Sequence, residues 1–272
     1  MISSGQKRNS FTAMIHSILK DKPTKVFGAL TAFFVANALI AECIGTKLFS
    51  LERTVGLTPH PFSLLGQDGL TYVLTCGVLL WPLEFILTDV VNEFYGPKAV
   101  RRISYTAVAL IGYAFLMFYL AIRIPADTSF WKTSQTASGV PDMQAAFSAI
   151  FGQGMWIIFG SLVAFFVSQL VDVTVFHRIK KATGEKNVWL RATGSTLVSQ
   201  LVDSFIVLGI AFGKSWGWQR VLAVGLVNYS YKATMAIVLT PVIYLIENRI
   251  AAYFGPETTR KMKQAAMGKE AE

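Results

Sequence analysis

The pentapeptide SQLVD occurs twice in this chain, and both copies lie within stretches that are otherwise almost wholly apolar. Each copy carries one amide and one carboxylate, Gln169 with Asp172 and Gln200 with Asp203. On a helix the two side chains of one copy share a face, because residues three apart are neighbours there. An amide beside a carboxylate can bind the polar edge of a small molecule, and a buried carboxylate can also carry a proton. We expect the two copies on successive, oppositely directed helices, at different depths.

Four polar or ionisable residues fall at a similar depth on four predicted helices: Asn37, Glu84, Asp203 and Lys232. Asp203, for example, lies 12 residues beyond Arg191, or about 18 Å along a helix. An ionisable group at mid-membrane depth costs about 2.5–3.5 kcal/mol on insertion scales, so each should face the bundle interior and find a partner. Lys232 is the one cation at this depth in the sequence, and Asp203 or Glu84 can neutralise it. We expect these side chains to converge on a shared internal cavity.

Two of the predicted helices carry a polar face. In the segment 192–212, five polar residues fall within about 140° of the helix circumference at about 100° per residue, and in the last segment Asn228 and Lys232 share a face. Serine and glutamine in such positions can also serve only to join helices, with hydrogen bonds worth about 0.6 kcal/mol each. Both interpretations stay open for the small polar residues, whereas a purely structural role rarely needs a charge as deep as Asp203 or Lys232.

A second group of polar residues lies in the motif LTDVVNEFYG, which ends at Gly96. Its members Asp89, Asn92 and Glu93 lie near the predicted cytoplasmic end of a helix, where carboxylates can reach lipid headgroups or the basic cluster at 98–102. We interpret these three residues as candidates for coupling or gating.

The composition is that of a membrane protein. Of the 272 residues, 53% are hydrophobic and only 15% are charged, and the mean hydropathy is +0.48. The net charge of +9 is spread over short clusters between apolar runs, which argues against a nucleic-acid partner. The sequence contains neither a phosphate-binding G-x-x-x-x-G-K-[ST] loop nor a recognisable metal or catalytic motif, and we predict no cofactor, no metal and no enzymatic activity.

Six apolar runs are long enough to cross a bilayer core of about 30 Å. They occupy residues 26–49, 69–91, 103–122, 150–176, 192–212 and 221–246. The predicted fold class is therefore all-α, a polytopic bundle of six transmembrane helices. We expect a cytoplasmic tail at 1–25, a transport domain at 26–249 and a charged, frayed cytoplasmic tail at 250–272, with extracytoplasmic connectors at 50–68 and 123–146.

The distribution of lysine and arginine predicts the orientation. If alternate loops are assigned to opposite sides, 18 of these residues fall on one side and five on the other. Because cytoplasmic loops carry the excess of positive charge, both termini are predicted to be cytoplasmic.

Four motifs resemble the queuosine precursor transporter family, also called the vitamin uptake transporter family. They are LTDVVNEFYG with the basic cluster after it, SQLVDV, RATGSTLVSQLVDSFI and YKATMAIVLTPVIY. The resemblance runs from about residue 26 to residue 247. It implies a six-helix inner-membrane protein of bacteria that takes up 7-deazaguanine precursors of queuosine. Glu84 departs from the family pattern, in which we expect an uncharged residue.

The resemblance and the residues together predict an inner-membrane importer that binds a flat, purine-like base in a central polar cavity. A deep carboxylate would permit proton coupling. The expected partners are a nucleobase-like small molecule and the lipid bilayer, and the sequence leaves open a homo-oligomer or an energising partner. The expected substrate-binding residues are Asn37, Gln169, Asp172, Gln200, Asp203, Asn228 and Lys232, with Asp203 accepting hydrogen bonds from the base.

Three other classes of protein make different predictions. A substrate-capturing subunit energised by a separate ATPase would not transport alone in lipid vesicles. A membrane-embedded enzyme is disfavoured because the three histidines lie in or beside loops. A structural scaffold would tolerate loss of Asp203 without loss of uptake.

Overall fold

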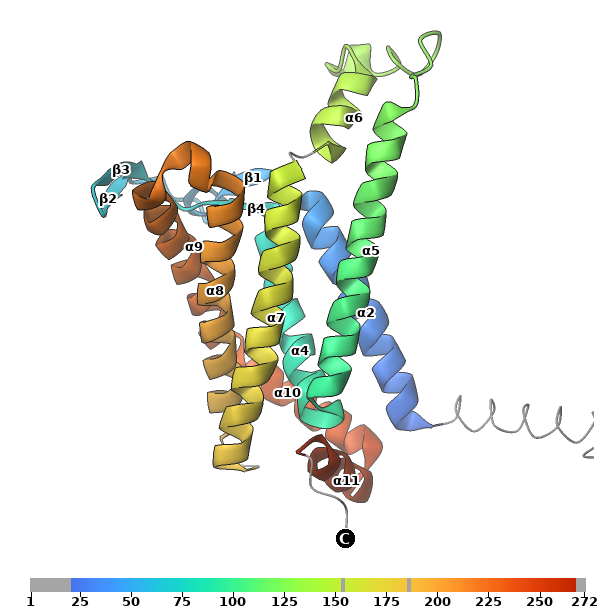
Figure 1. Ribbon diagram of the computed structural model, residues 1–272, viewed down its shortest axis with the longest axis vertical. Coiled ribbons are helices and arrows are strands. Elements are labelled where there is room, and N and C mark those ends of the chain that lie inside the picture. Colours follow the sequence, from blue (N-terminus) through green and yellow to red (C-terminus); the bar gives the residue numbers. More distant parts are fainter. Residues whose placement is uncertain (1–20, 153–154, 185–186, 268–272) are drawn as a thin grey trace, which may run out of the picture.

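The computed structural model describes residues 21–152, 155–184 and 187–267. The chain is mostly helical, with long, roughly parallel helices packed side by side (Figure 1). The greater part of the N-terminal tail expected at 1–25 and the last residues of the C-terminal tail lie outside the described residues.

Within the described residues, five helices are long and apolar enough to cross a membrane. They are α2 (Lys22–Ile44), α5 (Pro97–Arg123), α7 (Met155–Thr183), α8 (Val188–Trp216) and α9 (Trp218–Val238). Each overlaps most of one predicted apolar run. The chain is therefore a polytopic membrane protein.

The second predicted run is helical only in its later part. Residues 69–91 begin in the strands β3 (Gln67–Leu70) and β4 (Val73–Thr75) and pass through the 3-10 turn η1 (Cys76–Leu79) into α4 (Trp81–Tyr95). Pro82 lies in the first turn of α4, where its missing N–H leaves no hydrogen bond unmade, so it begins the helix and does not kink it. The 15 residues of α4 extend about 22 Å, and a sixth membrane crossing at this helix stays a prediction.

The sixth predicted run is divided in two. The helix α9 ends at Val238, and α10 (Thr240–Phe254) begins around Pro241. A further helix, α11 (Pro256–Ala266), packs against α4 and α10. The expectation of a frayed tail beyond residue 250 is thus wrong for these residues, because the amphipathic α11 finds a protein surface to cover.

Small elements at the other end of the bundle correct the all-α prediction in part. The strand β1 (Leu48–Ser50) pairs antiparallel with β4, and β2 (Phe62–Leu64) pairs antiparallel with β3. The short helix α3 (Leu51–Thr54) follows β1 directly, while the connector between α5 and α7 contains the turn η2 (Thr136–Ser138) and α6 (Met143–Phe151). The start of α2 and the helix α11 lie at the opposite end from the strands (Figure 1). The side of the membrane on which each end lies stays a prediction.

Two apolar clusters hold the helices together. The first joins α2, α4, α5 and α7 around Phe34, Ile111 and Phe165. The second joins α4, α7, α8 and α10 around Phe94 and Ile243. The second cluster lies next to the polar residues of α4. Many large apolar side chains on the outer faces of the helices are exposed, as expected for a surface that faces acyl chains.

Gly96 connects α4 to α5 and touches α11. Its φ of 79° and ψ of 176° lie in a region that is essentially restricted to glycine, and an added Cβ would lie 3.2 Å from the Ala266 Cα.

Gly96→Ala should therefore lower the free energy of unfolding by about 1–3 kcal/mol from the backbone alone and loosen α11. Thermal unfolding in detergent should show a lower midpoint. The control Gly112→Ala, within α5 and with no atom within 4 Å of the added Cβ, should unfold at or above the wild-type temperature, and an equal loss in both variants would contradict the assignment.

Candidate functional site

A pocket with about 420 Å³ of empty space lies between α4, α8, α9 and α10. Its walls are mainly apolar, with three large aromatic side chains, Trp81, Phe85 and Tyr231. Its polar lining residues are Asp89, Thr193, Thr196, Gln200 and Lys232. We call this space the central pocket. Apolar walls with a few convergent polar groups are typical of a small-molecule site.

Several polar atoms of the central pocket have no partner within the described residues. These are both carboxylate oxygens of Asp89, the Nε2 of Gln200 and the Oγ1 of Thr196, all deeply buried. A buried polar atom without a hydrogen bond costs about 1–3 kcal/mol. The central pocket therefore offers unpaired hydrogen-bond acceptors and donors to a polar ligand.

The expected neutralisation of Lys232 occurs through Asp203. The Lys232 Nζ lies 2.5 Å from the Asp203 Oδ2, and the two side chains are 12% and 15% exposed. Lys232 lines the central pocket, whereas Asp203 does not. The deep aspartate of the second SQLVD therefore acts on the pocket through the lysine.

Asn37 and Glu84 form a second pair. The Asn37 Nδ2 donates to the Glu84 Oε1 at 3.0 Å and to the Leu80 carbonyl oxygen at 3.1 Å. Neither side chain lines the central pocket. The four deep residues thus form two pairs, and of the four only Lys232 lines the pocket.

The two SQLVD copies contact each other. Ser199 of the second copy donates to the Asp172 Oδ1 of the first at 3.2 Å, which joins α8 to α7. Gln169 accepts a hydrogen bond from Thr88 of α4 at 3.3 Å. The Asp172 Oδ2 and the Gln169 Nε2 have no partner among the described residues. Ser199 of the second copy therefore joins α8 to α7. In the first copy, Gln169 and Asp172 each keep one polar atom without a partner.

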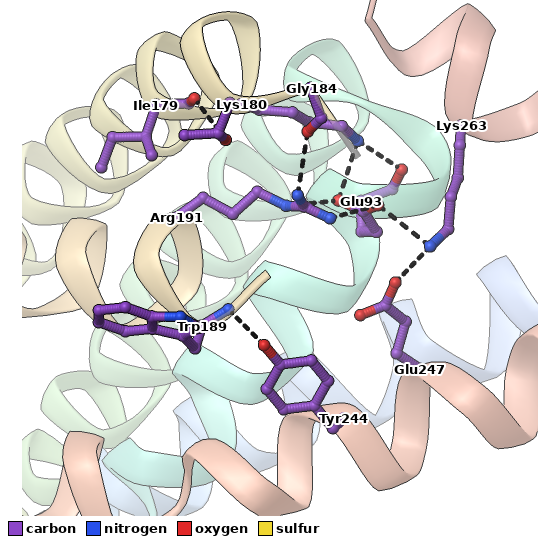
Figure 2. A network of polar contacts seen from close by, with 10 residues as sticks. Glu93, Ile179, Lys180, Gly184, Trp189, Arg191, Tyr244, Glu247 and Lys263 are labelled. Atoms are coloured by element: carbon purple, nitrogen blue, oxygen red, sulfur yellow. Dashed lines mark hydrogen bonds and ion pairs between the residues drawn. The ribbon is translucent and has the colours of Figure 1, made fainter. Parts of the chain in front are cut away.

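Glu93 is the centre of a buried ionic network (Figure 2). Its carboxylate contacts Lys180 of α7 at 2.9 Å, Arg191 of α8 at 2.8 Å and Lys263 of α11 at 3.2 Å. Arg191 uses two nitrogens, since its Nε also donates to Glu93 at 3.1 Å, and Lys263 additionally pairs with Glu247 of α10. Three helices besides α4 therefore meet at one carboxylate, and Lys263 links α10 to the same network.

Lys263 lies on α11, outside the predicted membrane-spanning segments. Burial lowers the pKa of its ammonium group, but the hydrogen bond to Glu247 and the charge of Glu93 outweigh burial, so the pKa is raised. The charge of Lys263 therefore contributes fully to the free energy of unfolding below the ordinary lysine pKa. This contribution is lost only as the pH rises through the raised pKa.

A second, smaller pocket of about 200 Å³ lies between the central pocket and the ionic network. Its lining includes Asp89, Glu93 and Glu247, so Asp89 borders both pockets. Asn92 is buried with both side-chain polar atoms unpartnered among the described residues, and Asn228 is half-buried and lines neither pocket. Asp89 is thus the one predicted coupling residue that also lines the central pocket.

Sequence reasoning missed several residues of this region. It did not choose among the many aromatic residues, and it treated Lys180, Arg191 and Lys263 only as orientation signals. The Trp81-Pro82 pair could have pointed to the aromatic residues. A proline inside an apolar run can mark the start of a helix, and Trp81 and Phe85 lie just at the start of α4. Nothing in the sequence indicates that cations from three helices pair with the same glutamate.

A bundle of apolar helices around an internal pocket lined by unpaired polar groups defines a multi-pass membrane protein of the solute transporter class. A family model described as "putative vitamin uptake transporter" matches residues 75–246, and the chain belongs to this family. It is therefore a transporter of the bacterial inner membrane and not an enzyme.

Three curated proteins are similar to the chain. A probable queuosine precursor transporter of Bacillus subtilis (strain 168) is 28% identical over 242 residues, 88% of this chain and 93% of that protein. The queuosine precursor transporter of Escherichia coli (strain K12) is 27% identical over 67% of this chain and 74% of its own length. A probable queuosine precursor transporter of Haemophilus influenzae is 25% identical over 69% and 72%. No solved structure matches the chain.

Replacing Glu93 tests the ionic network. Glu93→Gln keeps the shape but leaves buried cations without their counter-charge, so the free energy of unfolding should fall by about 3–5 kcal/mol. Chemical unfolding in detergent measures this loss. The control is Glu257→Gln, which removes the exposed ion pair with Lys261 and should leave stability unchanged. Equal stability of Glu93→Gln and wild type would show that the network does not hold the helices together.

Proposed function

We propose that this protein imports queuosine precursors, bases of the 7-deazaguanine type, and binds them in the central pocket. The observation that carries the proposal is the set of unpaired buried atoms on Asp89, Thr196 and Gln200 beside three aromatic side chains. The three relatives, all named as queuosine precursor transporters, support the same class of substrate.

The chemistry of a deazaguanine fits these groups. Its edge offers two adjacent N–H donors, the ring N1–H and the exocyclic amine, which a carboxylate can accept together. The Gln200 amide nitrogen can donate to the ring carbonyl, and the faces of Trp81, Phe85 or Tyr231 can pack on the flat base. A purine without the N1–H leaves the carboxylate unpaired and is rejected.

The geometry favours Asp89 over Asp203 as the residue that accepts from the base. Asp203 is already paired with Lys232 and does not line the central pocket, whereas both oxygens of Asp89 are unpaired there. Of the residues predicted to bind substrate, Gln200 and Lys232 line the pocket. Those that do not line it are Asn37, Gln169, Asp172, Asp203 and Asn228, and we assign them to the surrounding layer.

The ionic network is the proposed gate at one end of the path. It closes the space beyond the smaller pocket with Glu93 at its centre, and Asn92 lies buried in the same turn of α4. Opening this end requires separation of at least one of the helices that Glu93 joins. This assigns a gating role to Asn92 and Glu93, and it moves Asp89 into the substrate site.

Asp89→Asn tests the substrate contact. The amide can accept one hydrogen bond but cannot accept both N–H groups of a deazaguanine, and loss of a charge-assisted pair corresponds to about 1.5–3 kcal/mol. Equilibrium binding of 7-deazaguanine to the purified protein should weaken about 10- to 150-fold, while discrimination against adenine decreases. Wild-type affinity and discrimination in this variant would exclude Asp89 from the site.

Two neighbouring residues on α8 give a matched comparison. Gln200 lines the pocket and is buried, whereas Leu201 is 39% exposed on the outer face. Gln200→Ala should weaken 7-deazaguanine binding about 2- to 12-fold, the equivalent of one hydrogen bond of about 0.5–1.5 kcal/mol. Leu201→Ala should bind normally. An equal effect of the two substitutions would contradict the pocket assignment.

Uptake by the chain alone in lipid vesicles separates an importer from a capture subunit that needs an ATPase.

A further inference from the structure

The central pocket and the smaller pocket share two lining residues among those that the structure describes, Asp89 of α4 and Ile243 of α10. Residues that line both spaces form the partition between them. Ile243 is 7% exposed and packs in the apolar cluster around Phe94. A base that leaves the central pocket through the smaller pocket therefore passes between these two side chains.

A second pair from the same two helices lines the smaller pocket further along. Glu93 of α4 and Glu247 of α10 both contribute to its wall, each about 6 Å along its helix from the partition. The Lys263 ammonium group of α11 contacts the Glu93 carboxylate at 3.2 Å and also pairs with Glu247 (Figure 2). Lys263 therefore joins α10 to α4 across the end of this space.

One face of α4 and one face of α10 supply both of these constrictions. Asp89 and Glu93 are four residues apart on α4, and Ile243 and Glu247 are four residues apart on α10, so each pair shares a helix face. The two helices pack against each other in the same region. Separation of α10 from α4 therefore widens both constrictions in one movement.

The chain is interrupted where α10 begins. The helix α9 ends at Val238, and Pro241 follows in the first turn of α10. Proline has no N–H, so residue 241 cannot make the helical hydrogen bond to the carbonyl oxygen of Ile237. Thr240 attaches this point to α8, because its hydroxyl oxygen lies 2.6 Å from that of Thr193. A helix end with an interrupted hydrogen-bond ladder and a fixed attachment is a suitable hinge.

The contact through Lys263 is the most deeply buried polar contact that holds α10 in place at its later part. Two other hydrogen bonds, from the Trp189 backbone N–H to the Tyr244 hydroxyl and from Lys22 to the Tyr253 carbonyl oxygen, are both 2.9 Å long and exposed, so water can replace them. The side chains of Lys263, Glu247 and Glu93 are 16%, 7% and 3% exposed. Loss of the Lys263 contact therefore has the larger effect on the position of α10.

We propose that α10 is the gate helix of this transporter and Lys263 its latch. The helix tilts away from α4 about the break at residues 239–241, and release of Lys263 opens the partition at Ile243 and the network end together. The inference rests on the proposed function for the molecule that passes, because the base is assigned to the central pocket.

Cysteine labelling tests the latch without any substrate. In a chain that carries Cys43→Ala and Cys76→Ala, the variant Val90→Cys places a thiol in the wall of the smaller pocket. The matched position is Ile111→Cys, which is equally buried but lies in the other apolar cluster and lines neither pocket. A water-soluble methanethiosulfonate reagent is added to the purified protein, and the labelling rates are compared with and without Lys263→Met.

Lys263→Met should raise the labelling rate of Val90→Cys about 10- to 150-fold, the change in open population that corresponds to loss of one charge-assisted hydrogen bond. The rate at Ile111→Cys should not change. The control Lys261→Met removes only an exposed ion pair of the same helix and should leave both rates unchanged. No increase at Val90→Cys, or an equal increase at both cysteines, would overturn the latch.

Pro241→Ala tests the hinge by transport, because alanine restores the N–H and favours a continuous helix through the break. In lipid vesicles, exchange of labelled for unlabelled 7-deazaguanine should be slower than in wild type, while equilibrium binding of the base to the purified protein stays the same. The control Pro256→Ala changes a proline in the first turn of α11 and should exchange as wild type does. Exchange at the wild-type rate in Pro241→Ala would overturn the hinge. Absence of binding and exchange in wild type would refute the proposed function, whereas the labelling rates test the gate independently of the base.

Discussion

One buried carboxylate organises the end of the bundle at which α4 and α7 end. Charges removed from water are tolerated only when they are paired and hydrogen-bonded, and Glu93 meets this condition for cations from three helices at once. Lys180 and Arg191 have no exposed surface, so neither has solvent as an alternative partner. The network also explains why the charged segment after residue 255 is a helix, since Lys263 attaches α11 to Glu93 and Glu247. This end of the bundle is therefore held by electrostatics as well as by apolar packing.

The buried polar groups divide into two kinds. Those that are paired within the protein, such as Asp203 with Lys232 and Asn37 with Glu84, join helices to one another. Others have buried atoms without a partner among the described residues and line the central pocket, with Asp89, Thr196 and Gln200 as the clearest examples. In hydrocarbon an unpaired group has no water to replace its partner, so its persistence calls for a bound molecule or a bound proton.

Apolar periodicity predicted the long helices well and the interruptions poorly. A run such as 69–91 has the same hydropathy whether its first half is strand, turn or helix, so only the position of Pro82 distinguished these cases. Depth along a helix was predictable from the rise per residue, and it anticipated the pairing of Asp203 with Lys232. The rotation of each helix about its axis was not predictable from one sequence, because it depends on the neighbours. Asp89 was therefore assigned to coupling from its depth, although its side chain lines the central pocket.

The break before α4 connects fold and site. Gly77 of η1 packs directly on α2, where a Cβ would lie 2.6 Å from the Ala41 carbonyl oxygen, so a larger residue would push the two segments apart. Irregular backbone at membrane depth persists only where protein groups satisfy it, and Asn37 of α2 donates to the Leu80 carbonyl oxygen at this point. The helix that starts here then places Trp81, Phe85 and Asp89, spaced by four residues, on the face toward the central pocket. Asn37 therefore holds the start of α4, and with it the helix face toward the central pocket, without lining that pocket itself.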